Sequence, residues 1–321
     1  MTDPAVVDEA RRAISRGSKS FSAAARLFDR ETRDSVVMLY AWCRHCDDVV
    51  DGQTFGHRQA EGDRSEAAER IARLYERTRA AVRGKTVEEP AFAGLAVVTR
   101  KHGIPERLLL EHLNGFRHDV EGRVYRSFED TLDYCYGVAG VVGVMMALVM
   151  GVRHDATLDR ACDLGLAFQL TNIARDVVED ASIGRIYLPQ DWLVHAGVPP
   201  DDLIAPHHRA ALATVAARLV EAAEPYYRSA GVGLRALPIR SAWAIAAARE
   251  VYRAIGVEVR RRGESAWDER VATSKLDKVC HLLNGAGAAS AARTIGRLLP
   301  EPPRQGLWAR PTAEEATLTA S

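Results

Sequence analysis

The amino-acid sequence predicts an all-α protein built as one helical domain. Along most of the chain apolar residues recur at spacings of three and four, which is the period of an amphipathic helix. Segments with the alternating pattern of a half-buried strand are almost absent. Alanine-rich runs, such as the one over 210–224, favour helix by intrinsic propensity. Together these observations predict a single compact helical domain over 1–299.

The predicted helices follow one another along the chain, with glycine or proline between them. The most apolar stretch, 138–152, is shorter than the roughly 20 residues that cross a bilayer, so we expect a buried helix there. From Pro300 onward the chain is proline-rich and then polar, which predicts a disordered tail over 300–321. The segments with helical spacing are 32–51, 64–83, 105–120, 157–180, 203–230, 238–261 and 275–298.

The overall composition narrows the classes of function. The 43 basic residues equal the 43 acidic ones, so no basic excess points to a nucleic-acid partner. An odd number of cysteines, five, fits a reducing, cytoplasmic environment better than a disulfide framework. The N-terminal residues lack the apolar core of a signal peptide. No glycine-rich dinucleotide motif follows a strand pattern, so we expect no nicotinamide cofactor.

Two aspartates at a spacing of four lie on one face of the helix predicted over 32–51. At about 100° per residue, Tyr40, Arg44, Asp47 and Asp51 fall within a sector of about 60°. Like charges at this spacing oppose helix formation, so another interaction must compensate for the repulsion between the two carboxylates. A solvated acidic face is the alternative, but the flanking residues are strongly apolar and the helix dipole disfavours carboxylates near a C-terminus.

A second pair of aspartates repeats this arrangement later in the chain. Gln169, Asn172, Asp176 and Asp180 fall within a sector of about 80° on the helix predicted over 157–180. The two amides on the aspartate face suggest a polar cavity, since a buried amide needs a hydrogen-bond partner. The neighbouring Arg175 is equally well explained as a structural partner of Asp176.

Two such faces across a cavity suit a magnesium site. Mg²⁺ prefers carboxylate, water and phosphate oxygens and usually shares its coordination between a few protein ligands and a substrate phosphate. The metal would neutralise a leaving diphosphate, so that its C–O bond breaks to give an allylic cation. Apolar walls would keep water from that cation. The residues therefore predict metal-dependent ionisation of a diphosphate.

At this point the sequence resembles the squalene/phytoene synthase family, over roughly 10–295. Each motif is weak alone, but the ordered set is specific. The resemblance implies an all-α terpenoid-synthase bundle around a central cavity. The stretches that carry it are GSKSF (17–21), LYAWCRHCDDVVD (39–51), YCYGVAGVVG (134–143), LGLAFQLTNIARDVVED (164–180) and GRIYLP (184–189).

Matching positions to the family's motifs implies a role for each candidate residue. The metal, Mg²⁺ or Mn²⁺ in its place, would be held by Asp47, Asp51, Asn172, Asp176 and Asp180. Substrate would be bound by Ser18, Lys19, Ser20, Tyr40, Arg44, Gln169, Asn172, Arg175, Tyr252 and Arg270. The catalytic set would be Asp47, Asp51, Asp176, Asp180, Tyr134 and Tyr187.

The resemblance implies head-to-head condensation of two geranylgeranyl diphosphates, through prephytoene diphosphate, to phytoene, the first committed step of carotenoid biosynthesis. The nearest alternative is a C15-using relative that makes squalene, dehydrosqualene or hydroxysqualene from farnesyl diphosphate. A chain-elongating prenyltransferase and a non-catalytic helical scaffold are further alternatives. The expected partners are isoprenoid diphosphates, with transient peripheral contact at the inner membrane face and association with other carotenoid-pathway enzymes.

Overall fold

The computed structural model describes residues 4–17, 24–50, 53–54, 57–58, 64–85, 87–271 and 275–311. Within these ranges the all-α prediction is confirmed, apart from a small antiparallel ladder between β1 (Gln53–Thr54) and β2 (His57–Arg58). The N-terminal half contains α1 (Pro4–Gly17), α3 (Arg30–Val50), α4 (Arg64–Val82), α5 (Pro90–His102), α6 (Glu106–Glu121), α7 (Phe128–Cys135), the π-helix η1 (Tyr136–Gly140) and α8 (Val141–Val149).

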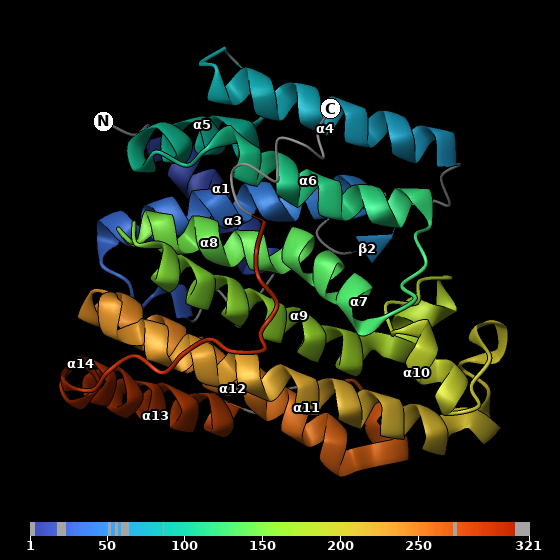
Figure 1. The fold of residues 1–321 in the computed structure, drawn as a ribbon. Helices are drawn as coiled ribbons and strands as arrows, with labels where there is room; N and C mark the ends of the chain where they lie inside the picture. The colour runs from blue at the N-terminus through green and yellow to red at the C-terminus, as the bar shows by residue number, and fades with distance from the viewer. Residues whose placement is uncertain are drawn as a thin grey trace.

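The C-terminal half continues the bundle, and the helices run in tiers from α4–α6, through α3, α8 and α9, to α11–α13 (Figure 1). Its elements are α9 (Asp155–Ser182), α10 (Gln190–His195), η2 (Pro200–Asp202), η3 (Pro206–His208), α11 (Arg209–Gly233), η4 (Leu234–Ala236), α12 (Ile239–Arg262), η5 (Gly263–Trp267), α13 (Lys275–Arg293) and α14 (Ile295–Leu298).

Local sequence signals explain where several helices begin and end. Pro90 opens α5, where its missing N–H costs no helical hydrogen bond. Gly103 ends the same helix with φ of 64°, a left-handed conformation that glycine adopts without strain. Ser127 and Asp130 form a capping box at the start of α7. The helix predicted from residue 203 begins only at Arg209, because Pro206 interrupts the hydrogen bonding before it.

The apolar segment α7–η1–α8 is the central helix of the bundle. It runs without interruption over Phe128–Val149, so it is longer than the apolar stretch alone suggests and is long and apolar enough to cross a membrane. However, 72% of its most apolar window is buried inside the structure, as expected for a core helix. It packs closely on α9: a Cβ added at Gly165 would lie 2.2 Å from the Ala139 carbonyl oxygen.

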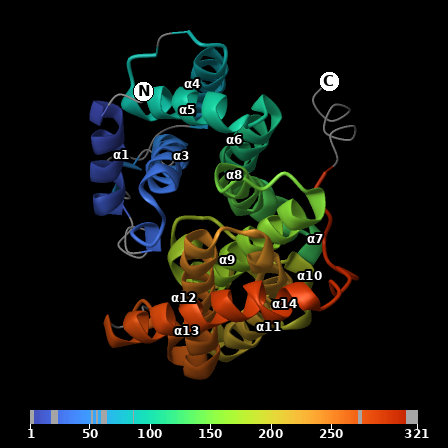
Figure 2. The ribbon, with the colours of Figure 1, turned by 90° about the vertical axis from the view of Figure 1, so that its left-hand side faces the viewer.

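The tail predicted to be disordered begins at Pro300, and the structure describes its first part, 300–311. This segment, which we call the C-terminal strap, leaves α14 and crosses the outer side of α9 and α7 (Figures 1 and 2). Arginines and a tryptophan attach it there: Arg304 pairs with Asp163, Arg310 with Asp159, and the Trp308 indole with Asp133. The proline-rich composition hid these anchors, which side chains rather than backbone hydrogen bonds provide. Residues 312–321 lie outside the described residues.

Candidate active site

A cavity of about 430 Å³ runs through the middle of the bundle. Most of its wall is apolar and comes from α8, α9 and α12, with α3 on one side. On α9 the wall extends from Thr157 to Asn172, which is about 22 Å at 1.5 Å per residue. Arg44, Asp47, Gln169 and Asn172 line one end of the cavity, which we call its polar end. The longer remainder, its apolar end, is mainly apolar, with Thr157 and Arg160 as polar lining residues on α9.

The first predicted motif lies at the polar end. Tyr40, Arg44 and Asp47, on α3, all line the cavity. The Arg44 guanidinium pairs with Asp47 at 2.7 Å and with Asp48 at 2.8 Å, while its buried Nε has no hydrogen-bond partner in the described structure. Asp51, and Ser18, Lys19 and Ser20 of the GSKSF stretch, lie outside the described residues.

The second motif faces the same cavity from α9. Gln169 and Asn172 both line it, and the Asn172 amide nitrogen donates to Gln169 Oε1 at 3.3 Å. This leaves the Asn172 Oδ1 buried without a hydrogen-bond partner in the described part of the chain. A buried carbonyl oxygen of this kind requires a partner that the protein alone does not supply.

Two arginines pair with Asp176, one turn beyond Asn172. Arg175 Nε donates to Asp176 Oδ1 at 2.8 Å, and Arg270 donates to Oδ2 at 3.3 Å. Arg270 is held there by η5, because the Trp267 indole donates to the Ala174 carbonyl on α9 at 3.2 Å. Arg175 therefore pairs with its neighbour Asp176, and both arginines lie beside the aspartate motif.

Asp180 lies one further turn along α9. Burial, with the charge of Asp176 as the next cause, raises the pKa of the Asp180 carboxyl to about 7, although Arg185 opposes the rise. A raised pKa in a buried carboxyl indicates that no neighbouring positive charge stabilises the carboxylate enough to offset the cost of its burial. A divalent ion would supply that charge.

Tyrosines from two elements stack beside this carboxyl. The rings of Tyr134, on α7, and Tyr187, in the loop after α9, lie 4.4 Å apart and 14° from parallel. The Thr131 hydroxyl fixes that loop by donating to the Tyr187 carbonyl at 3.0 Å. Burial raises the pKa of the Tyr134 phenol well above its usual range, so the group stays a proton donor at neutral pH.

Asp119, on α6, belongs to the same group of side chains and was missed by the sequence analysis. The Tyr134 hydroxyl donates to Asp119 Oδ2 at 3.5 Å, and the Asp119 charge contributes to the raised pKa values of Tyr187 and Asp180. No second carboxylate lies four residues away from Asp119, so the spacing that revealed the other aspartates gave no signal here.

The last predicted tyrosine, Tyr252, lines the cavity from α12. Its ring stacks on Phe168 with 4.1 Å between centroids. Burial raises the pKa of its phenol, and the nearby Arg175 opposes that rise. Tyr252 therefore connects the apolar wall to the polar end of the cavity.

These side chains fit a divalent magnesium ion. The available donors are carboxylate and amide oxygens, which Mg²⁺ prefers over the nitrogen and sulfur ligands of zinc sites. Asn172 Oδ1 is buried without a hydrogen-bond partner among the described residues, and Asp180, about two turns further along α9, has a carboxyl with a raised pKa, so such an ion would satisfy both groups. Arg44 beside them would suit the anion that accompanies it.

Comparison with known proteins decides the family. The squalene/phytoene synthase family model matches residues 14–277, which is most of the chain. The chain belongs to the squalene/phytoene synthase family. It is 55% identical to a phytoene synthase of Pseudescherichia vulneris, with 97% of this chain and 100% of the relative covered. It is 51% identical to a 15-cis-phytoene synthase of Pantoea ananas over the same shares of the two chains.

Solved structures of this family have the same fold. A dehydrosqualene synthase in complex with ligand aligns with a TM-score of 0.79 and 27% identity, over 89% of this chain and 97% of that one. A squalene synthase from Alicyclobacillus acidocaldarius aligns with a TM-score of 0.71 and 25% identity, over 81% and 94%. The terpenoid-synthase bundle that the squalene/phytoene synthase motifs implied is therefore confirmed.

Proposed function

We propose that this protein joins two geranylgeranyl diphosphates head to head to make phytoene, through prephytoene diphosphate, in a reaction that depends on Mg²⁺. One observation supports this above the others: a long apolar cavity ends at a polar group that includes Asp47 and the partnerless oxygen of Asn172. Full-length similarity above 50% to two bacterial phytoene synthases supports the choice of substrate.

The chain's own residues can perform most of the work at the polar end. Asp47, Asp51, Asn172, Asp176 and Asp180 would hold Mg²⁺, or Mn²⁺ in its place. The ion, when bound, supplies positive charge to the diphosphate oxygens as the C–O bond breaks. Ser18, Lys19, Ser20, Tyr40, Arg44, Gln169, Arg175 and Arg270 would orient those oxygens.

The walls and the tyrosines govern what happens after ionisation. Apolar side chains from α8, α9 and α12 exclude water from the cation. Tyr134, Tyr187 and Tyr252 present aromatic faces and phenols near it, and a cation is attracted to the face of such a ring. Tyr134 keeps its proton, because burial and Asp119 both oppose its ionisation.

Product analysis tests the proposal. Purified protein should form a C40 hydrocarbon from geranylgeranyl diphosphate and Mg²⁺, without a reductant, and chelation of the metal should abolish it. A C30 product from farnesyl diphosphate, with no turnover of the C20 substrate, would instead establish the squalene-type alternative.

Single substitutions test the two acidic faces. Asp47→Asn and Asp176→Asn should each lower kcat by about 100-fold or more, since each removes charge from the place where the transition state develops it. Asp155→Asn, on the same helix as Asp176 but 86% exposed at its other end, is the matched control. Unchanged turnover in both site variants would reject the enzyme assignment and favour a helical scaffold.

We also propose that the protein works in the cytoplasm and contacts the inner membrane face transiently. Its substrates and product are extremely apolar, so transfer to and from a bilayer is the physically favoured route. Association with other carotenoid-pathway enzymes would serve the same transfer. Sedimentation with vesicles, with and without preloaded C20 diphosphate, measures this contact, and recovery of all the protein in the supernatant would exclude it.

A further inference from the structure

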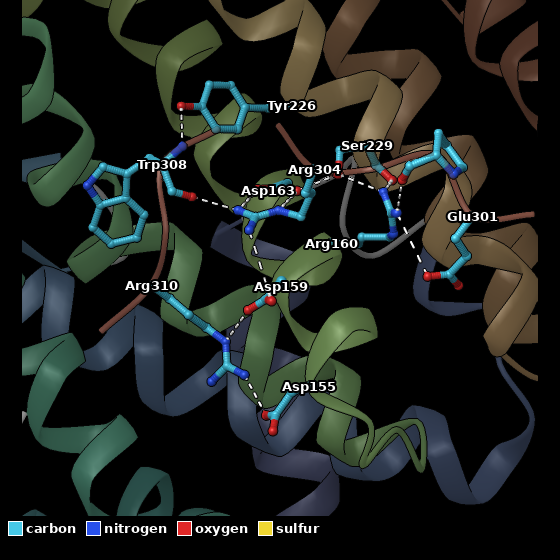
Figure 3. A network of polar contacts seen from close by, with 11 residues as sticks. Asp155, Asp159, Arg160, Asp163, Tyr226, Ser229, Glu301, Arg304, Trp308 and Arg310 are labelled. Carbon is cyan, nitrogen blue, oxygen red and sulfur yellow. Dashed lines mark hydrogen bonds and ion pairs between the residues drawn. The ribbon is translucent and has the colours of Figure 1, made fainter. Parts of the chain in front are cut away.

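The C-terminal strap is attached to α9 by a stripe of three aspartates. Asp155, Asp159 and Asp163 follow one another at a spacing of four, the same spacing as the aspartates at the active site. Two arginines of the strap neutralise these aspartates (Figure 3). Arg310 donates hydrogen bonds to Asp155 and Asp159, both at 2.6 Å. Arg304 donates two hydrogen bonds of 2.8 Å to Asp163. No metal is needed to balance this stripe.

Trp308 fixes the strap at a third place. Its indole N–H donates to Asp133 on α7 at 3.1 Å, its backbone N–H donates to the Tyr226 hydroxyl on α11 at 3.3 Å, and its ring lies 5.0 Å from that of Tyr136. Its carbonyl accepts a further bond from Arg304. The strap is thus held against α7, α9 and α11 together.

Arg160 lies between the strap and the cavity. It lines the cavity at the apolar end, about 24 Å along α9 from Asp176 at 1.5 Å per residue. Its side chain is 6% exposed, and its guanidinium donates to the Ser229 hydroxyl at 3.1 Å and to the Pro302 carbonyl of the strap at 2.7 Å (Figure 3). Glu301 adds an ion pair at 3.9 Å.

This arrangement makes a floor rather than a binding site for an anion. The guanidinium donates to Ser229 and to Pro302, neither of which lines the cavity, and its Nε is buried without a hydrogen-bond partner in the described structure. The aliphatic stem is therefore the part that a prenyl chain would meet. Gly233 lines the cavity beside that stem, and a Cβ added to it would lie 3.1 Å from the Arg160 Cβ. The stem is therefore confined on one side by α11 and on the other by the strap.

We propose that Arg160, anchored by the C-terminal strap, is the floor that limits the length of the prenyl chain the cavity accepts. The inference rests on the proposed use of isoprenoid diphosphates. With the diphosphate held at the Asp176 end, the ω-end of the chain points along α9 toward Arg160. Because the strap bonds the Arg160 head on its far side, the floor cannot retreat when a longer chain presses on it.

The test compares chain lengths in two variants that act in opposite directions. Arg160→Ala removes the floor, so the ratio of kcat/KM for a C25 diphosphate to that for the C20 diphosphate should rise about ten-fold or more. Gly233→Ala, compatible with its helical φ of −62°, pushes the stem inward, so the ratio of C15 to C20 should rise instead. Arg310→Met, which removes a strap anchor that does not touch Arg160, should leave both ratios unchanged.

Binding of non-hydrolysable thiolodiphosphate analogues of each length, read as the shift in thermal midpoint, gives the same comparison without turnover. Length preferences within two-fold of wild type in both variants, with circular dichroism showing a folded protein, would overturn the floor. If Arg160→Ala fails to fold, Gly233→Ala decides alone. Absence of phytoene from the wild type would instead count against the proposed function, while the binding series still reports on the floor.

Discussion

Replacing Arg304 by methionine should destabilise the protein strongly, although Arg304 lies far from the cavity's polar end. Its partner Asp163 is 0% exposed, and the two side chains share a pair of parallel hydrogen bonds of 2.8 Å. Removing one member of a buried ion pair leaves an uncompensated charge, which costs about 3–5 kcal/mol of unfolding free energy. Ser229 still donates to Asp163 in the variant, so we expect about 3 kcal/mol at pH 8.

The unfolding free energy that Arg304→Met loses should be larger at high pH than at low pH. Burial already raises the pKa of Asp163, and the hydrogen bonds from Arg304 are the largest influence that opposes the rise, so the variant's pKa lies higher still. A carboxyl whose pKa is raised by folding stabilises the fold when protonated, and that contribution is lost as the pH rises through the folded pKa. The variant should therefore be closer to wild type at about pH 5 than at about pH 8.

Urea unfolding followed by circular dichroism measures both effects. Arg310→Met is the matched control, because its partners are 86% and 29% exposed and such pairs contribute about 1 kcal/mol or less. A double variant, Arg304→Met with Asp163→Leu, should lose less than the sum of the single losses. The reasoning fails if Arg304→Met costs no more than the control at pH 8, or if its cost is the same at both pH values.

Three further outcomes follow from the structure. Binding of Mg²⁺ with inorganic pyrophosphate should strengthen as the pH rises through about 7, because the Asp180 carboxyl must lose its proton; equal calorimetric affinities on either side of that pH would contradict it. Asp119→Asn should lower kcat about ten-fold with an unchanged urea midpoint, since it weakens the bond that holds the Tyr134 phenol; full activity would assign Asp119 no part in positioning. Gly165→Ala should cost about 1–3 kcal/mol through its clash with the Ala139 carbonyl. Gly287→Ala, with nothing within 4 Å, should cost nothing in the same denaturation.

Helix periodicity and motif spacing in the sequence predict most of the fold and part of the candidate site. The face of Tyr40, Arg44 and Asp47 was predictable, because a 3.6-residue helix places them together and all three line the cavity. The amides of Gln169 and Asn172 were predictable on the same grounds. Asp119 was not, since its position depends on how α6 packs against α7, and packing leaves no periodic trace in a single sequence.

The contacts that fix the C-terminal strap left no signal in the sequence, for a different physical reason. Sequence patterns reveal segments that satisfy their own backbone hydrogen bonds, whereas 300–311 is fixed by side chains that meet partners more than a hundred residues away. Its prolines lower the entropy lost on ordering, so a short extended segment with a few strong anchors can be stable. The same composition, read without those partners, indicates disorder.

Helix α9 shows how one sequence pattern serves two kinds of chemistry. At about 100° per residue, Asp163 lies about 180° around the helix from Asn172, so its stripe faces the strap while Gln169 and Asn172 of the second motif line the cavity. Arg304 and Arg310 neutralise the outer stripe from the same chain. At the inner end the pKa of Asp180 stays raised to about 7 even with Arg185 nearby, so its charge is left for a ligand to balance. The spacing of the aspartates is the same in both places, and what separates structure from function is whether the fold itself supplies the cation.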